Sequence, residues 1–181
     1  MANKKVLLTG VDLRRPSMHK FFNLDNSKGV STFLAGKDQF EDTILPTNIE
    51  SLDVMIAGPV PPNPAELLGT NRLSELIDKA SQLYDYIVID TPPVALVTDA
   101  LLISKYTDAN VFIIRQNFSP KGALEMITNL KDKNIREISL LVNDIRESKA
   151  FGYRYYYGYG YGYGYSYGYQ YRYGDKYYNK T

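Results

Sequence analysis

Short apolar runs alternate with amphipathic stretches along most of the chain. Each run holds four to six mostly apolar residues, a length typical of buried β-strands. These runs are residues 6–9, 52–57, 86–89, 111–115 and 138–143. The stretches between them predict helices, most clearly over residues 71–82, where apolar side chains recur every three to four positions. Further helices are expected over residues 29–36, 99–105 and 119–133. Strand–helix alternation with short connections predicts a three-layer α/β fold with a mainly parallel sheet and right-handed crossovers.

The run over residues 86–89 ends on a carboxylate, Asp90, and two prolines follow shortly after it. Proline stops a strand because it cannot donate to the sheet ladder. Ligands of open α/β sheets bind at the carboxyl ends of strands. Asp90 is therefore either a magnesium-binding aspartate of the Walker B type or a simple capping residue of a buried strand. The strand alone leaves both interpretations open.

A second carboxylate, Asp12, follows the first apolar run and precedes Arg14, Arg15 and Pro16. Asp12 is placed to reach a metal ion or its water shell. The two guanidinium groups offer paired donors for phosphate oxygens. The alternative is a solvated turn with a local Asp–Arg pair. The pattern indicates a candidate phosphate site at this edge of the sheet. It does not decide between that site and a local Asp–Arg pair.

The loop over residues 58–64 contains four prolines and is predicted to be stiff, because each proline fixes φ. This loop is expected on the same sheet edge as Asp12 and Asp90. It either lines a nucleotide pocket or serves only as the entry to the next helix. His19, the only histidine, has no second candidate ligand nearby and is interpreted as a surface or partly packed residue.

The formal net charge of the 181 residues is +1, so no overall basic field predicts a nucleic-acid partner. The absence of cysteine excludes a disulfide framework and a cysteine-based metal site, and it fits a reducing compartment. No run approaches the roughly 18 apolar residues of a spanning helix.

Residues 151–181 differ sharply from the rest, since they contain 14 of the 17 tyrosines and 7 of the 13 glycines. Tyrosine and glycine alternate strictly over residues 157–165. Glycine at every second position argues against a strand through its backbone entropy and its missing side chain. The sequence predicts two parts, a globular core over residues 1–150 and a disordered, low-complexity tail over residues 151–181.

Four segments together resemble the bacterial protein-tyrosine kinases that accompany capsule and exopolysaccharide export. These enzymes belong to a P-loop lineage shared with septum-site and chromosome-partition ATPases. Residues 6–16 are similar to the second Walker-type motif of the family, called A′, and residues 58–68 to its proline-rich segment before a helix. Residues 87–93, followed by 98–100, look like the Walker B region. The tyrosine-rich tail resembles the autophosphorylation cluster.

The resemblance implies an α/β fold of the P-loop NTPase type and an ATP-dependent tyrosine kinase that uses ATP and Mg²⁺. By the same resemblance Asp12 and Asp90 would hold the metal, and Asp12 would also accept the tyrosine proton. Arg14 would contact phosphate or a subunit interface, and Pro62 and Asn63 would contact the nucleotide. The implied phosphoacceptors are Tyr153, Tyr155, Tyr156, Tyr157, Tyr159, Tyr161, Tyr163, Tyr165, Tyr167, Tyr169, Tyr171, Tyr173, Tyr177 and Tyr178.

The resemblance also implies partners and a location. The first expected partner is a further copy of the same chain, since the copies would phosphorylate one another in a homo-oligomer. The others are a membrane polysaccharide co-polymerase domain or protein and a tyrosine phosphatase. No nucleic-acid partner is expected. The expected location is the cytoplasmic face of the bacterial plasma membrane, reached through an upstream or partner membrane segment.

Two features depart from the family pattern. The Walker A loop, rich in glycine and ending in Lys and Ser or Thr, is absent, since the only Gly-Lys pair is Gly36-Lys37 and Asp38 follows it. The first of two acidic residues common in motif A′ corresponds to Gly10. We therefore expect the carboxy-terminal part of a kinase, truncated at its amino terminus and inactive alone.

Two other functions stay open beside this one. A partition-type P-loop ATPase would account for the α/β core but not for the tyrosine tail. A nucleotide-incompetent regulatory module, which presents its tyrosines to another kinase or to the export machinery, would account for both the tail and the missing Walker A loop.

Overall fold

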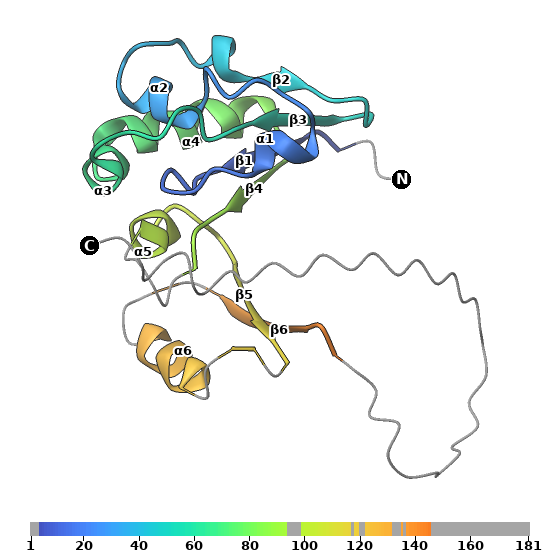
Figure 1. Ribbon diagram of the computed structural model, residues 1–181, viewed down its shortest axis with the longest axis vertical. Helices are drawn as coiled ribbons and strands as arrows, with labels where there is room; N and C mark the ends of the chain where they lie inside the picture. The colour runs from blue at the N-terminus through green and yellow to red at the C-terminus, as the bar shows by residue number, and fades with distance from the viewer. Residues whose placement is uncertain are drawn as a thin grey trace, which may run out of the picture. The chain divides into compact units, whose positions relative to one another are not determined.

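A computed structural model describes residues 4–93, 99–116, 118–119, 122–131, 135 and 137–145. The contacts within the chain separate residues 1–146 from residues 147–181, and the fold below is that of the first unit (Figure 1). The predicted tail lies outside the described residues. So does Thr98, which precedes the helix expected over residues 99–105 and is its candidate cap. In the described part of the chain, no helix combines the length and apolar character needed to span a bilayer.

The first sheet has the strand order β2-β3-β1-β4. Its strands are β1 (Val6–Gly10), β2 (Leu45–Pro46), β3 (Leu52–Met55) and β4 (Tyr86–Asp90). β1 lies in parallel between β3 and β4, whereas the two-residue β2 pairs with β3 in the antiparallel direction. The β-branched and leucine-rich runs thus form the parallel centre that their sequences predict.

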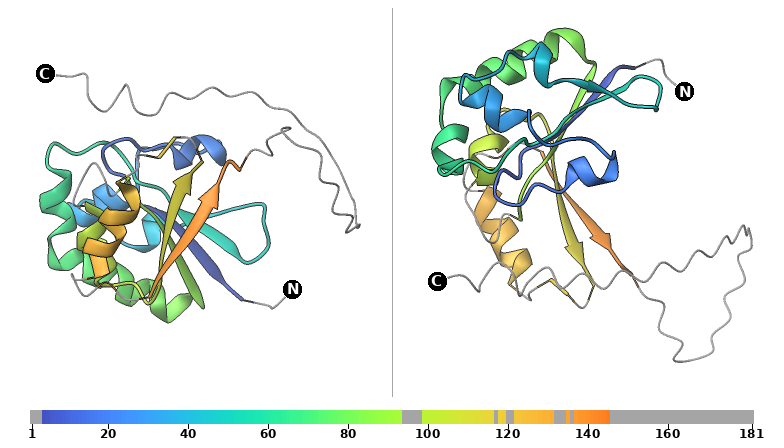
Figure 2. Two further views of the ribbon diagram at one scale, coloured as in Figure 1. Left: turned by 90° about the horizontal axis from the view of Figure 1, so that it is seen from below. Right: turned by 45° about the horizontal axis from the view of Figure 1, so that its top comes forward.

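The second sheet is a parallel pair, β5 (Asn110–Arg115) and β6 (Ile138–Asn143). The helix α6 (Ala123–Lys131) lies between these strands in the sequence, as a parallel crossover requires. Figures 1 and 2 show β5 and β6 side by side. The mainly parallel α/β fold is confirmed, but the sheet is divided into four and two strands, which the sequence pattern does not predict.

The other helices are short except for one. They are α1 (Met18–Phe21), α2 (Val30–Leu34), α3 (Pro64–Leu68), α4 (Asn71–Leu83) and α5 (Asp99–Ser104), with a 3₁₀ turn at Glu41–Thr43. The amphipathic helix expected over residues 71–82 is confirmed by α4, which buries Leu73, Leu76 and Ala80. The sequence of residues 37–50 predicts a loop with one further turn of helix, and the structure has that turn at Glu41–Thr43. It also has the strand β2, which was not expected because two residues are too few to show a period-2 pattern.

The main core packs on one face of the first sheet. Leu7, Phe33, Leu73 and Leu76 are all at most 1% exposed there, and the ring of Phe40 meets that of Phe33 edge to face at 6.2 Å between centroids. A smaller cluster of Met18, Val54 and Ile56 covers the other face, together with Leu8 and Phe22. β1 and β3 are therefore covered on both faces, as central strands of a parallel sheet require.

Candidate functional site

The two sequence-predicted aspartates follow neighbouring parallel strands. Gly10, at the end of β1, pairs with Asp90, at the end of β4. The next residue, Val11, donates its N–H to the carbonyl oxygen of Asp90 at 2.8 Å. The β1 loop that carries Asp12 is thus attached to the end of the strand that carries Asp90, at the sheet edge where α/β proteins bind ligands.

The two carboxylates act on one another electrostatically. Partial burial raises the pKa of Asp90 above its ordinary value, and the negative charge of Asp12 raises it further. Two carboxylates that repel each other in a partly desolvated place form an oxygen donor pair suited to a hard divalent cation such as Mg²⁺. In the residues that the structure describes, His, Asp and Glu form no cluster of three or more that would complete a metal cage. Asp12 and Asp90 are therefore the candidate metal-binding pair among the described residues.

The backbone of the β1 loop fixes the orientation of Asp12. Its Oδ1 accepts hydrogen bonds from the backbone N–H groups of Arg14, at 3.1 Å, and Arg15, at 2.9 Å. This is the local turn that an aspartate at this position forms with the residues after it. The carboxylate is therefore held in place before any ligand binds.

Arg14 forms a bidentate ion pair with Asp99, the first residue of α5. Its Nε donates to Asp99 Oδ2 at 2.7 Å and its Nη2 to Asp99 Oδ1 at 3.1 Å. The Asp99 side chain is only 1% exposed, whereas that of Arg14 is 36% exposed. The pair ties the β1 loop to the helix that follows β4, so it supports both halves of the candidate site. The phosphate or interface contact expected of Arg14 stays a prediction.

The sequence places Asp99 at a helix start and in the segment that resembles the Walker B region, and neither observation predicts this contact. The partners are 85 residues apart, so no local pattern joins them. The one signal in the sequence is an acidic residue in the first helical turn after a strand-end carboxylate, which is also typical of an ordinary helix N-terminus.

The proline-rich loop is anchored at its amino end. Asn26 accepts the N–H of Gly58 at 3.1 Å and donates to its carbonyl oxygen at 2.6 Å, and Ser31 donates to the carbonyl oxygen of Pro59 at 2.7 Å. Gly58 has φ +78°, and a Cβ there would lie 2.7 Å from Ser31 Oγ, so only glycine fits this turn. The predicted stiffness thus has a structural cause beyond the prolines.

The nucleotide-binding candidates in this loop, Pro62 and Asn63, are exposed at its end. Asn63 precedes α3 and donates from Nδ2 to Glu66 Oε2 at 2.7 Å. These contacts are those of a helix entry, the simpler of the two interpretations of the loop. Nucleotide binding by Pro62 and Asn63 stays a prediction.

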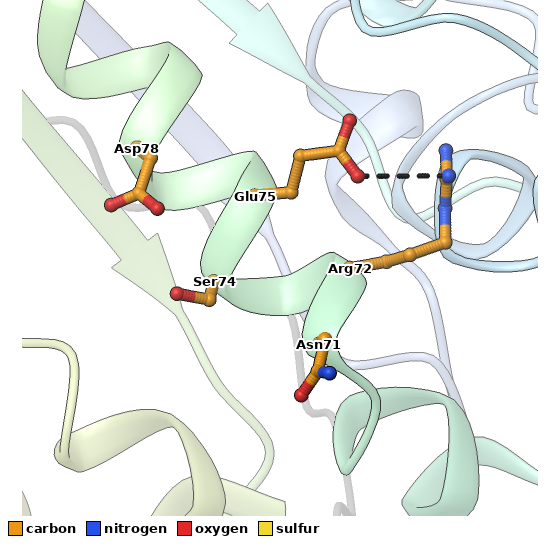
Figure 3. Close-up of a pocket in the computed structure, with 5 residues that line it drawn as sticks. All are labelled: Asn71, Arg72, Ser74, Glu75 and Asp78. Atoms are coloured by element: carbon orange, nitrogen blue, oxygen red, sulfur yellow. Dashed lines mark ion pairs between the residues drawn. The ribbon is translucent and has the colours of Figure 1, made fainter.

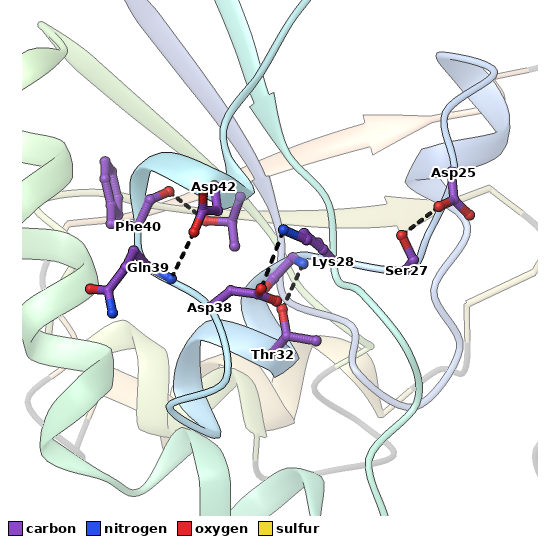
Figure 4. A network of polar contacts seen from close by, with 10 residues as sticks. Asp25, Ser27, Lys28, Thr32, Asp38, Gln39, Phe40 and Asp42 are labelled. Carbon is purple, nitrogen blue, oxygen red and sulfur yellow. Dashed lines mark hydrogen bonds and ion pairs between the residues drawn. The ribbon is translucent and has the colours of Figure 1, made fainter.

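The polar contacts around α2 show why Gly36-Lys37 is no phosphate loop (Figure 4). Gly36 has φ +72° and closes the carboxyl end of α2, whereas phosphate loops lead into a helix amino terminus. Asp38, the next residue, forms an ion pair with Lys28 at 3.4 Å. The Thr32 hydroxyl accepts the N–H of Gly29 at 3.0 Å at the start of α2. The segment is organised as a helix with its own caps.

The surface has two hollows, of which one adjoins the candidate site. One, of about 460 Å³, lies against α4 alone and is lined by Asn71, Arg72, Ser74, Glu75 and Asp78 (Figure 3). Arg72 and Glu75 form an ion pair there at 3.6 Å. The other, of about 1350 Å³, runs along β4 and includes Asp90, Thr91 and Pro92 in its lining. The second is the one that adjoins the candidate site.

Comparison with known proteins decides the family. No family model matches the chain. The putative tyrosine-protein kinase CapB of Staphylococcus aureus is 34% identical over 156 residues, which cover 86% of this chain and 68% of CapB. The chain belongs to the bacterial tyrosine-protein kinases. The tyrosine-protein kinase ptk of Acinetobacter johnsonii is 39% identical over 153 residues, and there the chain spans only 21% of the relative.

Solved structures agree with the family. The kinase domain of the Escherichia coli tyrosine kinase ETK superposes with a TM-score of 0.78 at 31% identity, over 87% of this chain and 62% of that domain. The septum-site protein MinD of Pyrococcus horikoshii, solved with Mg-ADP, shares the fold at a TM-score of 0.60 and 21% identity. The family and the P-loop fold inferred from the four motifs are therefore confirmed.

Proposed function

We propose that this chain is the Walker A′ and Walker B portion of an ATP-dependent protein-tyrosine kinase. It would phosphorylate the tyrosines of its own residues 151–181 and thereby regulate polysaccharide export. The observation that carries the proposal is the pair Asp12 and Asp90 at the ends of neighbouring parallel strands, in a chain that belongs to this family.

The aspartates would have distinct tasks. Both would hold Mg²⁺, which in phosphoryl transfer neutralises charge on the transferring phosphate. Asp12, oriented by two backbone N–H groups, would also accept the proton of the incoming tyrosine hydroxyl. Arg14, through its ion pair with the buried Asp99, would keep the β1 loop in register with the segment after β4. Pro62 and Asn63 would lie against the nucleotide.

The tail would serve as substrate in a neighbouring copy of the chain. Between residues 150 and 181 four basic residues face one acidic residue, so the formal charge is 4 − 1 = +3. Each phosphotyrosine adds about −1.5 to −2 at pH 7. Two modifications would therefore remove the positive charge of the tail, and further ones would make it anionic. Repulsion between the phosphorylated tails would then loosen the assembly of copies until a phosphatase restores the charge. The cytoplasmic face of the plasma membrane is the place that this role requires.

Phosphorylation of this chain in the presence of further sequence from a relative tests the proposal. The chain is mixed with ATP, Mg²⁺ and the part of CapB outside the matched 156 residues, and phosphotyrosine is detected. We expect labelling that falls at least about a hundredfold in Asp12→Asn and in Asp90→Asn. Asp78→Asn, an exposed aspartate on α4, is the matched control and should retain full labelling.

If the chain is a tyrosine-presenting module, the second candidate function, its labelling should not depend on Asp12 and Asp90. Intact CapB would then label the chain in trans, and neither Asp12→Asn nor Asp90→Asn would reduce the signal. That result would overturn the kinase role and leave the tail as a substrate only. A partition-type ATPase, the third candidate, predicts ATP hydrolysis without phosphotyrosine.

A further inference from the structure

The proline-rich loop between β3 and α3 presents apolar groups to solvent (Figure 1). Pro59 is exposed, Val60 is 59% exposed, and Pro61 is only partly covered. Single exposed apolar residues are normal on a protein surface, whereas neighbouring ones form a patch that marks an interaction site. We call these three residues the proline surface.

The proline surface is rigid before anything binds to it. Asn26 and Ser31 hold the start of the loop through the hydrogen bonds described above. Val60 and Pro61 each precede a proline, which restricts them to extended backbone conformations. A rigid segment loses little conformational entropy on binding. Extended, proline-rich segments of this kind are recognised by aromatic side chains, which pack against the proline rings.

The loop also leaves the sheet beside the candidate site. β1 and β3 are parallel neighbours, so the loops that follow them start at the same sheet edge. A Cβ placed on Gly10 would lie only 3.6 Å from the backbone nitrogen of Ala57. Asp12 follows Gly10 by two residues, and Pro59 follows Ala57 by two. A ligand held on the proline surface is therefore held near Asp12.

We propose that the tyrosine-rich tail of another copy of the chain docks on the proline surface through its tyrosine rings. The contact holds the tail beside Asp12, so Val60 and Pro61 act as positioning residues for the substrate. The inference rests on the proposed function, because it names the surface that would position the tail for that reaction. Pro62 and Asn63, at the far end of the loop, keep their predicted place against the nucleotide.

The composition and reach of the tail suit this surface. After Phe151 the tail contains no valine, isoleucine, leucine or methionine, so its tyrosine rings are its apolar groups. Its formal charge of +3 complements the carboxylates of Asp12 and Asp90. The tyrosine–glycine repeat begins about a dozen residues after Ile145, and a flexible chain of that length reaches roughly 20 Å. That reach exceeds the radius of gyration of about 15 Å expected for 146 residues, so the repeat can extend to another copy.

The strict repeat over residues 157–165 gives the docking a particular property. A shift of the tail by two residues replaces each tyrosine by the next one and restores the same contacts. The proline surface would thus bind the tail in several equivalent registers, about 6–7 Å apart in an extended chain. Each register presents a different tyrosine to Asp12, so one rigid loop serves a series of phosphoacceptors.

Peptide binding tests the inference. A fluorescein-labelled peptide of residues 154–168 is titrated with the full chain in the absence of ATP, and its fluorescence anisotropy is recorded. We expect saturable binding that is at least about tenfold weaker for a peptide of the same charge in which leucine replaces every tyrosine. Val60→Ser and Pro61→Ala in the chain should each weaken binding of the tyrosine peptide at least about fivefold.

The matched control is Ile49→Ser, which changes a 54% exposed apolar residue before the amino end of β3, away from the loop at its carboxyl end. This variant should bind the peptide as the unmodified chain does, and circular dichroism checks that all three variants fold. The inference is overturned if the peptide does not bind, if the leucine peptide binds equally well, or if Ile49→Ser weakens binding as much as Val60→Ser. Binding is measured without ATP, so its failure leaves the phosphotransfer test above unaffected, and the failure of that test leaves this one unaffected.

Discussion

The two sheets of this chain differ in how far their apolar strands are buried. β1 and β3 lie in the four-stranded sheet with apolar clusters on both faces, and Leu7, Val54 and Met55 are 0% exposed. β6 is just as apolar in sequence, yet Leu140, Leu141 and Val142 are each about 45% exposed. Burial is therefore decided by the neighbours that a fold supplies, and an apolar run shows only the capacity for it.

The largest expected effect separates two leucines that the sequence does not distinguish. Leu7→Ala in β1 should lower the free energy of unfolding by about 2–5 kcal/mol, since it removes buried methyl groups and leaves a cavity. Leu141→Ala in β6 should cost about 1 kcal/mol or less, because that side chain is 46% exposed already. Urea denaturation followed by circular dichroism measures both. Equal losses would mean that the second sheet is packed as tightly as the first in solution.

The second prediction compares two arginine–aspartate pairs, one for each sheet. Arg14→Gln should cost about 1.5–3 kcal/mol, because it leaves the buried Asp99 carboxylate without its charged donor. Arg115→Gln breaks the exposed pair with Asp144, formed at 2.9 Å beside β5 and β6, and should cost about 0–1 kcal/mol.

A second substitution, at the aspartate of each pair, shows whether the stability loss comes from an unpaired carboxylate. Asp99→Asn in the Arg14→Gln background should restore part of the lost stability, since a neutral amide is cheaper to bury than an unpaired carboxylate. Asp144→Asn in the Arg115→Gln background should change little. If Asp99→Asn instead lowers the free energy of unfolding further in the Arg14→Gln background, the ion pair is not what stabilises the β1 loop.

The sequence predicted the parts of the fold whose causes are local. The apolar stripe of α4 and the β-branched run of β4 were recognised because their patterns repeat within one element. Asp12 and Asp90 were brought to one sheet edge because parallel neighbours end on the same side.

Two of the features that escaped prediction depend on distant partners. The Arg14–Asp99 pair joins residues 85 apart, and its members look like a turn residue and a helix start when taken singly. The division into two sheets escaped because β4 and β5 each look like fully paired strands in sequence. The order in which strands pair is a non-local property, so a pattern of apolar runs predicts the strands and not the break between them.

The smallest expected effect concerns two tyrosines near the start of β4. Tyr84 donates its hydroxyl to Asp53 Oδ2 at 2.8 Å, which links this strand to β3 in the packed sheet. Tyr84→Phe should therefore cost about 0.5–1.5 kcal/mol at pH 7. Tyr86 is 59% exposed, so Tyr86→Phe should be nearly neutral.

Alkaline titration sharpens the contrast between these tyrosines. Burial raises the pKa of Tyr84 above its ordinary value of 10.0, and the hydrogen bond and charge of Asp53 raise it further. A group whose pKa is raised in the folded state contributes stability that is fully present below the unfolded pKa and is lost as pH rises toward the folded pKa. The unfolding free energy of the unmodified chain should therefore fall above about pH 10. The fall should be shallower in Tyr84→Phe than in Tyr86→Phe, and equal slopes in the two variants would show that the Tyr84 hydroxyl does not hold its proton through the contact with Asp53.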